Sequence, residues 1–378
     1  MIAKKLKANI FPNFVFGLYI ALSTVQYILG SLNFRERYFV ILFSPLLVNF
    51  FVKIPDEIRK YIIFFVLMVF VGSIFSSINQ GYGSLIYLVY SLINLSLVIF
   101  LFKKKVSEYV PLVVFLLFSA FVVYQSTLLD NINDIFPESS RNSISWIGLV
   151  LCALYYLLAF LNNCKSKSPF PLFVLVVICI LASGRSGIII SIIFFLCYFL
   201  FNYTAKKKIW YQITKNIVLL LVFIFFVLNY SYLFNEKLDY FYSEKFQNKI
   251  RIILTKKYLQ SLDPVSLFTG VKLNTIAVYK QYNYNPHNSY IKCHIQFGFM
   301  AIFLIGFLIY TFLRGSLNKN TFFLASIYGC ILLRIMTDKL VFVENYDFVI
   351  YFSSILIHTK LNKTNIISQT ETSDQIFL

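Results

Sequence analysis

The sequence ASGRSG at residues 182–187 lies between two apolar runs and carries the first group that could do chemistry, Arg185. Gly184 and Gly187 permit a tight turn, and the backbone N–H groups of such a turn can face an anion. A guanidinium binds two oxygens of a phosphate at once. The motif therefore predicts an anion site that includes Ser183. The alternative is that Arg185 is only the charged tip of a hairpin.

The sequence NPHNSY at residues 285–290 carries the second such group, His287. A neutral imidazole at a membrane interface can accept a proton from a hydroxyl, and Asn288 could orient a sugar or the ring itself. Tyr290 follows as a further candidate substrate contact. The alternative is structural, with Asn288 or Ser289 capping the helix that follows and His287 simply solvated.

Three more charged residues could act with these motifs. Arg251 belongs to an amphipathic stretch, where it could be a second cation for a pyrophosphate or one of several contacts to lipid headgroups. Arg334 and Asp338 are four residues apart, so both can face one side of a helix and form an intramembrane ion pair. We expect this pair to be mainly structural, with substrate binding as the alternative.

No residue pattern predicts a metal or a cofactor. The six cysteines form no CxxC pair and mostly lie inside apolar runs, so buried thiols are expected. The sequence contains no carboxylate cluster suited to a metal ion and no glycine-rich nucleotide-binding motif. His294 is expected to be a packed or hydrogen-bonded helix residue, and His358 a charged residue at the membrane interface.

The composition indicates which elements position these residues. Of the 378 residues 59% are hydrophobic and 13% charged, with a mean hydropathy of +0.74, whereas soluble domains have about 25% charged residues. These values exclude a soluble enzyme, a disordered chain and a secreted disulfide scaffold. The continuous apolar runs lack the alternation of an outer-membrane barrel. We therefore expect an all-α, polytopic integral membrane protein with a single domain over residues 1–378.

Twelve apolar stretches are predicted to be transmembrane helices, because about 20 apolar residues cross a hydrocarbon core of roughly 30 Å. They lie at residues 11–31, 37–52, 61–79, 83–102, 109–129, 145–162, 169–184, 186–203, 217–234, 289–313, 321–337 and 346–360. The first follows three lysines but shows no small-residue cleavage site, so we expect it to be a retained span rather than a signal peptide.

The basic residues predict how these spans are oriented. Lys and Arg exceed Asp and Glu by 18, and in a membrane protein such an excess reports orientation rather than binding of nucleic acid. Most basic residues of the short loops fall on one side, which places both termini in the cytoplasm. Residues 235–288, between the ninth and tenth spans, form a large outer loop. Within it, residues 244–262 predict an amphipathic helix on the membrane surface, ended by Pro264.

The order and spacing of these motifs resemble those of the O-antigen ligase/polymerase superfamily of bacterial membrane glycosyltransferases. SGRSG is similar to the SGSR turn of that family, with Arg185 matching its arginine. The stretch that begins at Pro286 is similar to its HNxxL…GxxGxxxF segment: His287 and Gly298 match, whereas Ala301 replaces the second glycine. LFTG at 267–270 is similar to the plfGxG stretch of that family but lacks its final glycine.

Two further features carry the resemblance, which covers roughly residues 180–345. LLRIMTDKLVF at 332–342 is similar to the lRxxxD helix of capsule and O-antigen polymerases, and Arg251 falls where the family has a loop arginine, although no tryptophan follows it. The resemblance implies a metal-independent, inverting glycosyltransferase of the GT-C type. It also implies the bacterial inner membrane as location, with the active face in the periplasm.

The resemblance further implies the reaction. A polymerase transfers the growing glycan from undecaprenyl pyrophosphate to the non-reducing end of a new lipid-linked repeat unit. Arg185 and Arg251 would hold the pyrophosphate, His287 would deprotonate or orient the acceptor hydroxyl, and no cofactor is needed. A chain-length regulator and a flippase would be its protein partners. The product would be O-antigen, capsule or another exopolysaccharide.

Two other functions compete with a polymerase. An O-antigen ligase is less favoured because the chain is short, its outer loop is modest and the Arg334/Asp338 segment is polymerase-like. A flippase for lipid-linked oligosaccharides, a transporter, should line a central cavity with its cations, whereas here they cluster on one face beside the large loop. A permease or a structural membrane protein would leave both the Arg185 turn and the His287 segment unexplained.

Overall fold

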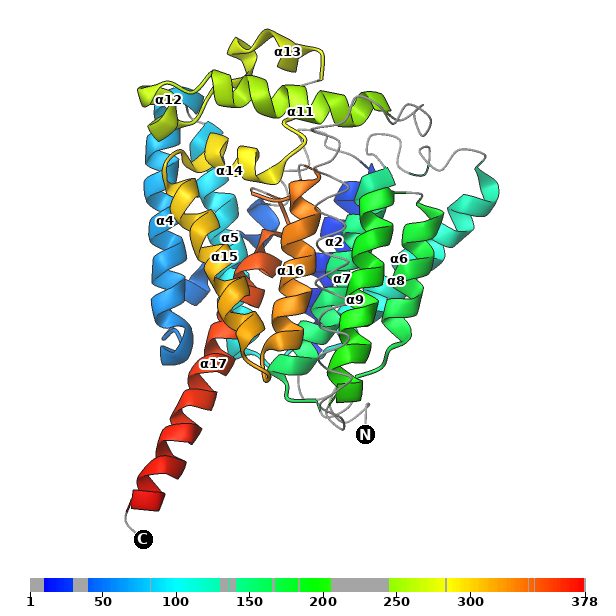
Figure 1. Ribbon diagram of the computed structural model, residues 1–378, viewed down its shortest axis with the longest axis vertical. Helices are drawn as coiled ribbons and strands as arrows, with labels where there is room; N and C mark the ends of the chain where they lie inside the picture. The colour runs from blue at the N-terminus through cyan, green and yellow to red at the C-terminus, as the bar shows by residue number, and fades with distance from the viewer. Residues whose placement is uncertain are drawn as a thin grey trace.

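The protein, described here from a computed structural model, is built of helices (Figure 1). The structure describes residues 10–29, 40–81, 83–129, 135, 141–164, 167–182, 184–204, 245–282, 284–338, 340–342 and 344–376. Within these ranges it contains no β-strand, so the predicted all-α class is confirmed. The expected ninth span, residues 217–234, lies outside the described residues.

The helices follow the apolar stretches of the sequence, because a helix satisfies its backbone hydrogen bonds internally where lipid offers no partner. The first half of the chain forms α2 (Ile10–Leu29), η1 (Ser44–Phe50), α4 (Asp56–Gln80), α5 (Gly83–Lys103), α6 (Tyr109–Leu128), α7 (Arg141–Leu161), α8 (Phe170–Leu181) and α9 (Arg185–Thr204). The second half forms α11 (Lys245–Gln260), α12 (Pro264–Thr269), η3 (Leu273–Thr275), α13 (Ala277–Lys280), α14 (Ser289–Phe297), α15 (Met300–Leu317), α16 (Phe322–Met336) and α17 (Asp347–Ile376).

Six of the described helices are long and apolar enough to cross a membrane. They are Ile10–Ile28, Asp56–Asn79, Ile86–Lys103, Tyr109–Leu128, Asn142–Leu161 and Met300–Leu317. Shorter apolar helices lie at Val40–Phe50, Phe170–Leu181, Ser186–Phe201 and Phe322–Met336. The protein is therefore a helical membrane protein.

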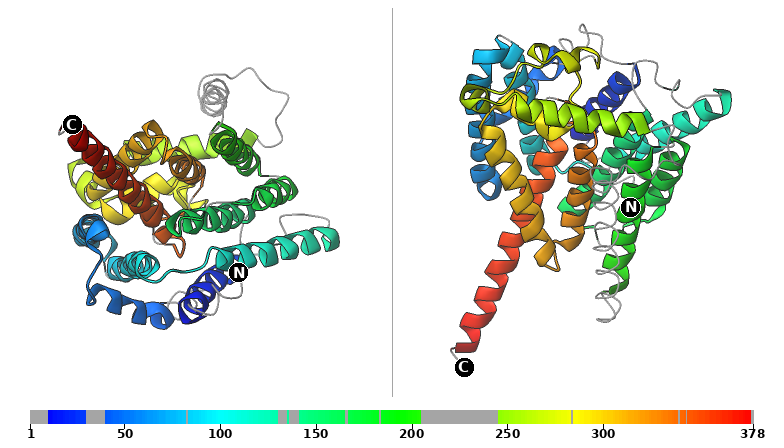
Figure 2. Two further views of the ribbon diagram at one scale, coloured as in Figure 1. Left: turned by 90° about the horizontal axis from the view of Figure 1, so that it is seen from below. Right: turned by 45° about the horizontal axis from the view of Figure 1, so that its top comes forward.

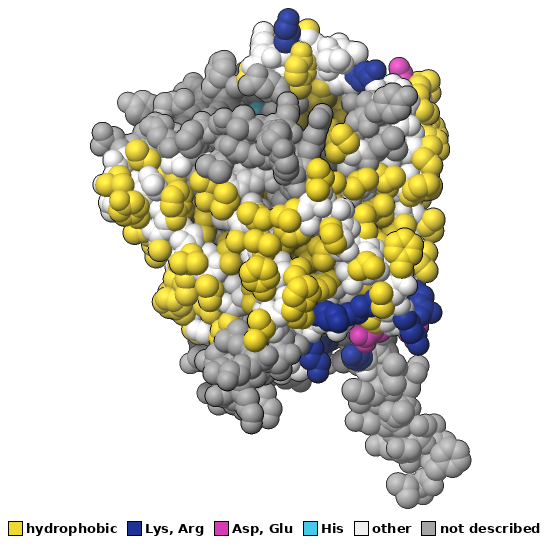
Figure 3. Space-filling model, turned by 180° about the vertical axis from the view of Figure 1, so that it is seen from behind, with side chains coloured by type: hydrophobic (Ala, Val, Ile, Leu, Met, Phe, Trp, Pro, Cys, Tyr) yellow, Lys and Arg dark blue, Asp and Glu magenta, His cyan; other side chains and the backbone are white. Residues whose placement is uncertain are grey.

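On the face seen in Figure 3, hydrophobic side chains cover the middle of the bundle, and Lys and Arg side chains gather at its lower edge. At that end Arg59 lies 2.5 Å from Asp56, and Lys363 lies 3.2 Å from Glu57. The opposite end is covered by α11, α12 and α13, which lie across the ends of the upright helices (Figures 1 and 2). The two ends thus differ in architecture.

The helix predicted over residues 244–262 is present as α11, and its inner face carries the buried side chains of Leu254 and Tyr258. Ile253 on the same helix is 46% exposed. Pro264 does not end α11 but begins α12, because Asp263 accepts the backbone N–H of Ser266 and forms a capping box.

The expected span at 289–313 is wrong in one respect, because it is broken into α14 and α15. Gly298 separates the two helices with φ of +51°, and a Cβ atom there would overlap the carbonyl oxygen of Phe268 on α12. The next residue, Phe299, donates its backbone N–H to that same carbonyl at 3.1 Å. The break lets α12 approach the chain, and it leaves α14 as a short helix beneath α11 (Figure 1).

Aromatic packing fixes the helix that precedes the candidate site. Phe323 on α16 is fully buried. Its ring contacts those of five residues on α7 and α9, namely Tyr156, Phe160, Phe194, Tyr198 and Phe201. These contacts hold α16 against α7 and α9, and therefore fix the position of Arg334 near its end.

Candidate functional site

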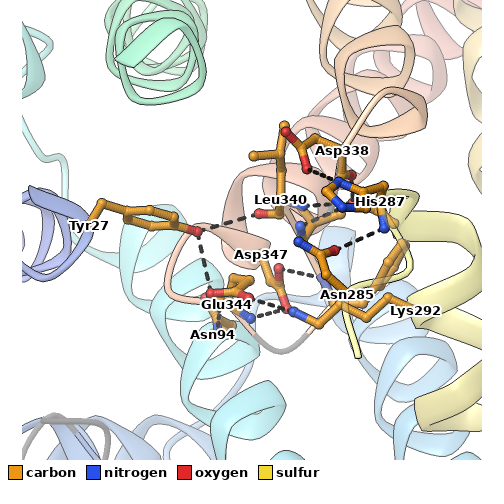
Figure 4. A network of polar contacts seen from close by, with 12 residues as sticks. Tyr27, Asn94, Asn285, His287, Lys292, Asp338, Leu340, Glu344 and Asp347 are labelled. Carbon is orange, nitrogen blue, oxygen red and sulfur yellow. Dashed lines mark hydrogen bonds and ion pairs between the residues drawn. The ribbon is translucent and has the colours of Figure 1, made fainter. Parts of the chain in front are cut away.

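His287 and Asp338 face each other at the end of the bundle that α11 covers (Figure 4). His287 Nδ1 lies 3.8 Å from Asp338 Oδ1, and the two side chains are 29% and 11% exposed. His287 comes from the segment that enters α14, and Asp338 from the connection between α16 and α17. The structure thereby places next to each other two residues that belong to separate candidate motifs in the sequence.

The backbone around His287 holds the ring in place. His287 has φ of +48°, a left-handed conformation that few non-glycine residues adopt. Its N–H donates to Asn285 Oδ1 at 2.9 Å, and Pro286 between them has a fixed φ. Asn288 caps α14 by accepting the N–H groups of Tyr290 and Ile291. Asn288 therefore has the structural role that we had considered as the alternative.

The α16–α17 connection is joined to α14 by the fully buried hydroxyl of Ser289. Ser289 Oγ donates to the backbone oxygen of Asp338 at 2.7 Å and accepts the N–H groups of Leu340 at 2.9 Å and Val341 at 3.3 Å. One hydroxyl thus binds the backbone of Asp338, Leu340 and Val341, so the backbone of Asp338 keeps a fixed place beside His287.

Asn142, the second residue of α7, links Asp338 to Arg334. Its side-chain Nδ2 donates to Asp338 Oδ2 at 3.0 Å, and its backbone oxygen accepts from Arg334 Nη2 at 2.8 Å. Arg334 also donates to Thr337 Oγ1 at 2.7 Å and to Ser145 Oγ at 3.2 Å. The expected pairing of Arg334 with Asp338 therefore runs through Asn142. Arg334 is fully buried and holds these groups in place.

The turn that carries Arg185 packs against the same part of α7. A Cβ atom on Gly184 would lie 3.5 Å from Asn142 Oδ1, and one on Gly187 would lie 2.5 Å from Ser145 Cβ. Gly187 therefore allows α9 to approach α7 more closely than any side chain would permit. The backbone of Arg185 begins α9, while its side chain and Ser183 lie outside the described residues.

Arg251 adds a cation to this end of the molecule. Its side chain is partly buried on α11. Lys256 and Lys257 on the same helix are exposed. Arg251 therefore differs from its basic neighbours in facing the bundle, where the His287 segment and the Arg185 turn also lie.

A second polar cluster, which the sequence did not predict, fixes the rest of the α16–α17 connection (Figure 4). The buried Lys292 on α14 pairs with Glu344, with Nζ 2.5 Å from Oε1. Asp347 accepts the backbone N–H groups of Phe342 at 2.9 Å and Glu344 at 3.1 Å. Asn94 Nδ2 donates to the backbone oxygen of Glu344 at 3.3 Å. Lys292 thus balances the charge of Glu344, while backbone N–H groups satisfy the carboxylate of Asp347, beside the His287–Asp338 pair.

Two other residues that the sequence singled out, both on α14, make contacts within the fold. Tyr290 donates its hydroxyl to the backbone oxygen of Leu332 at 3.1 Å, so it packs α14 on α16. His294 lies 2.7 Å from the hydroxyl of Tyr258 and 3.0 Å from the oxygen of Leu267, which confirms a hydrogen-bonded helix residue.

The expectation for His358 is wrong. Its side chain is buried, with Nε2 3.0 Å from Thr311 Oγ1 and the ring stacked on Tyr61 at 4.8 Å. The aromatic ring of Tyr61 and the hydroxyl of Thr311 together shield this histidine from the interface, so it is a core residue of the opposite half of the bundle.

No protein-family model, curated protein or solved structure matches this chain.

Five of the six cysteines are buried, as predicted, and all six are free thiols. Within the described ranges, no three His, Cys, Asp or Glu side chains lie together as metal ligands. The described site combines an imidazole that faces a carboxylate with a partly buried arginine on α11, at one end of the bundle.

Proposed function

We propose that the protein is a polymerase of lipid-linked oligosaccharide repeat units and works at the membrane face that α11 covers. The observation that carries this proposal is the His287–Asp338 pair, with its 3.8 Å separation, at the end of the bundle that also holds Arg251 and the Arg185 turn. A base and cations on one face suit a transfer reaction in which a hydroxyl attacks and a pyrophosphate leaves.

In the proposed step, His287 Nε2 accepts the proton of the acceptor hydroxyl as the oxygen attacks the anomeric carbon of the donor glycan. The bond from that carbon to the pyrophosphate oxygen breaks, and undecaprenyl pyrophosphate leaves with the electron pair. Attack from the opposite side inverts the anomeric configuration. Arg251 and Arg185 offset the charge that develops on the leaving group. Asp338 stabilises the imidazolium that forms on His287.

The proposal also fixes the sides of the membrane. The end with α11 would face the periplasm of a bacterial inner membrane, and the end with Lys363 and Arg59 would face the cytoplasm. An alkaline phosphatase fused at residue 270 should be active, whereas a fusion at residue 207 should be inactive. The reverse pattern would place the proposed site on the side where no flipped substrate is present.

The test of function is the glycan profile of a strain that lacks this protein, together with its lipid-linked intermediates. A polymerase predicts single repeat units that are flipped and joined to their final acceptor but never lengthened. Long polymer left on undecaprenyl pyrophosphate would instead indicate a ligase. Repeat units held on the cytoplasmic side would indicate a flippase, and would remove the catalytic roles of His287 and Arg185.

A further inference from the structure

Asn142 makes three kinds of contact that converge on the candidate site. Its side-chain Nδ2 donates to Asp338 Oδ2 at 3.0 Å, and its backbone oxygen accepts from Arg334 Nη2 at 2.8 Å. Its Oδ1 lies against Gly184, at 3.5 Å from the place of a Cβ atom. One residue at the start of α7 therefore touches the α16–α17 connection, the end of α16 and the Arg185 turn.

These contacts contribute to the orientation of the carboxylate of Asp338. Its backbone oxygen is held by Ser289 and one carboxylate oxygen, Oδ2, by Asn142. Rotation of the carboxylate would break the bond to Asn142, so the other oxygen, Oδ1, stays directed at His287 Nδ1. An amide suits this place because its NH2 group donates to a carboxylate without adding a charge.

The backbone of Asn142 is itself fixed by a buried cation. Arg334 is fully buried and reaches Asn142, Ser145 and Thr337 with its two terminal nitrogens. A buried guanidinium costs free energy unless its donors are satisfied. Moving the first turn of α7 would remove acceptors from Arg334, and this cost keeps Asn142 at its distance from Asp338.

We propose that Asn142 is a positioning residue that, through Asp338, keeps the proton of neutral His287 on Nδ1 and leaves Nε2 as the bare nitrogen. The tautomer of a histidine follows the partner that each ring nitrogen faces. A carboxylate accepts and never donates when ionised, so it favours a proton on the nitrogen that faces it. The catalytic meaning of the bare Nε2 rests on the proposed function, whereas the tautomer itself does not.

The small number of histidines makes this proposal measurable. The chain has three, His287, His294 and His358, so nitrogen-15 labelling of histidine gives few signals in the full-length protein in lipid nanodiscs. Each signal is assigned by a His→Gln variant. The spectra are recorded at alkaline pH, where unperturbed imidazoles are neutral. His294 is the internal reference, because its Nε2 faces the carbonyl of Leu267 and must carry the proton.

In the wild type we expect His287 to carry its proton on Nδ1 and His294 on Nε2. In Asn142→Ala and in Asp338→Asn the Nδ1–H signal of His287 should be lost, while His294 stays unchanged. Where the alanine variant does not fold, Asn142→Leu removes the donor and retains the volume. The matched control is Asn162→Ala, because Asn162 follows the other end of α7 and donates to the carboxylate of Glu108 at 3.1 Å.

Two results would overturn the proposal: a wild-type His287 protonated on Nε2, or an Nδ1–H signal that persists in folded Asn142→Ala or Asn142→Leu. A loss of the signal in Asn162→Ala as well would equally remove the special role of Asn142. Failure of the proposed function looks different. In that case the tautomers come out as expected, but glycan length does not depend on His287.

Discussion

His287 Nδ1 and Asp338 Oδ1 lie 3.8 Å apart, although the two residues belong to different connections, one before α14 and one after α16. The distance is longer than a hydrogen bond, so in the free protein the contact is electrostatic. Catalytic hydrogen bonds often tighten only when the substrate binds. We therefore expect the pair to close when a hydroxyl occupies the space beside His287 Nε2.

Substitution of a partly buried basic residue on α11 should affect polymer formation differently from substitution of an exposed one. Arg251→Ala should reduce polymer formation strongly, because Arg251 is partly buried and faces the bundle, whereas the exposed Lys256→Ala should change it little. Glycan length in a strain that carries each variant, at equal membrane abundance, checks this. Equal effects of the two substitutions would show that α11 acts only through its overall charge, for example on lipid headgroups.

The Lys292–Glu344 pair should contribute to stability mainly through charge balance. Lys292→Met leaves a carboxylate without its cation and should destabilise the protein, by less than the roughly 3–5 kcal/mol typical of a fully buried pair, because Glu344 is 28% exposed. The double variant Lys292→Met/Glu344→Gln should regain most of the loss. Thermal unfolding of the purified single and double variants measures the coupling free energy between Lys292 and Glu344. Additive losses in the double variant would mean that the pair is not energetically linked.

Two glycines of neighbouring helices offer a matched test of the α14–α15 break. Gly298→Ala places a Cβ atom against the carbonyl of Phe268 at a φ of +51° and should reduce the yield of folded protein. Gly306→Ala, inside α15 with open space around its Cβ, should be neutral or stabilising by about 0.5–1 kcal/mol. The two variants are compared by their elution profiles and by the midpoints of their unfolding curves. A well-folded Gly298→Ala would show that α12 does not need its close approach.

Stability should fall in acid through His294, which lies in α14, outside the six helices that could cross the membrane. Burial lowers the pKa of His294 below its usual 6.5. Below pH 6.5 the unfolded chain binds a proton at this histidine that the folded protein does not. The free energy of unfolding therefore falls as pH drops below 6.5 and levels off below the folded pKa. Above pH 6.5 this group contributes no pH dependence.

The variant His294→Gln isolates this effect. The difference in unfolding midpoint between wild type and His294→Gln should shrink as pH is lowered below 6.5, because only the wild type carries this proton-linked loss. A difference that stays constant over that range would show that His294 does not titrate on unfolding.

Much of the fold follows from local patterns, which is why it could be predicted. The apolar runs predict helices because only their composition matters, and the amphipathic spacing within residues 244–262 predicts α11. The break at Gly298 could not be predicted, because its cause is the carbonyl of Phe268, a neighbour in space only. His358 was misjudged for the same reason: its partner Thr311 lies on another helix.

The candidate site was predicted as separate residues and not as an arrangement. His287 and Asp338 were recognised by type and motif, but their pairing depends on how α14 packs on the α16–α17 connection. Asn142 gave no signal, because a single amide at the start of an apolar run is a common helix beginning. Its role exists only because α16 brings Asp338 to it. Lys292 gave no signal either, because its partner, Glu344, is remote in sequence.

The most direct test of the central claim uses the purified protein in lipid vesicles, supplied with the lipid-linked repeat units that accumulate in a strain lacking it. The wild type should convert single units into a ladder of longer lipid-linked chains. His287→Ala, at equal amount and with the same elution profile, should lose about 10²–10⁴-fold of that rate. Single units that the wild type leaves unchanged, or a ladder that His287→Ala makes at the wild-type rate, would contradict the account.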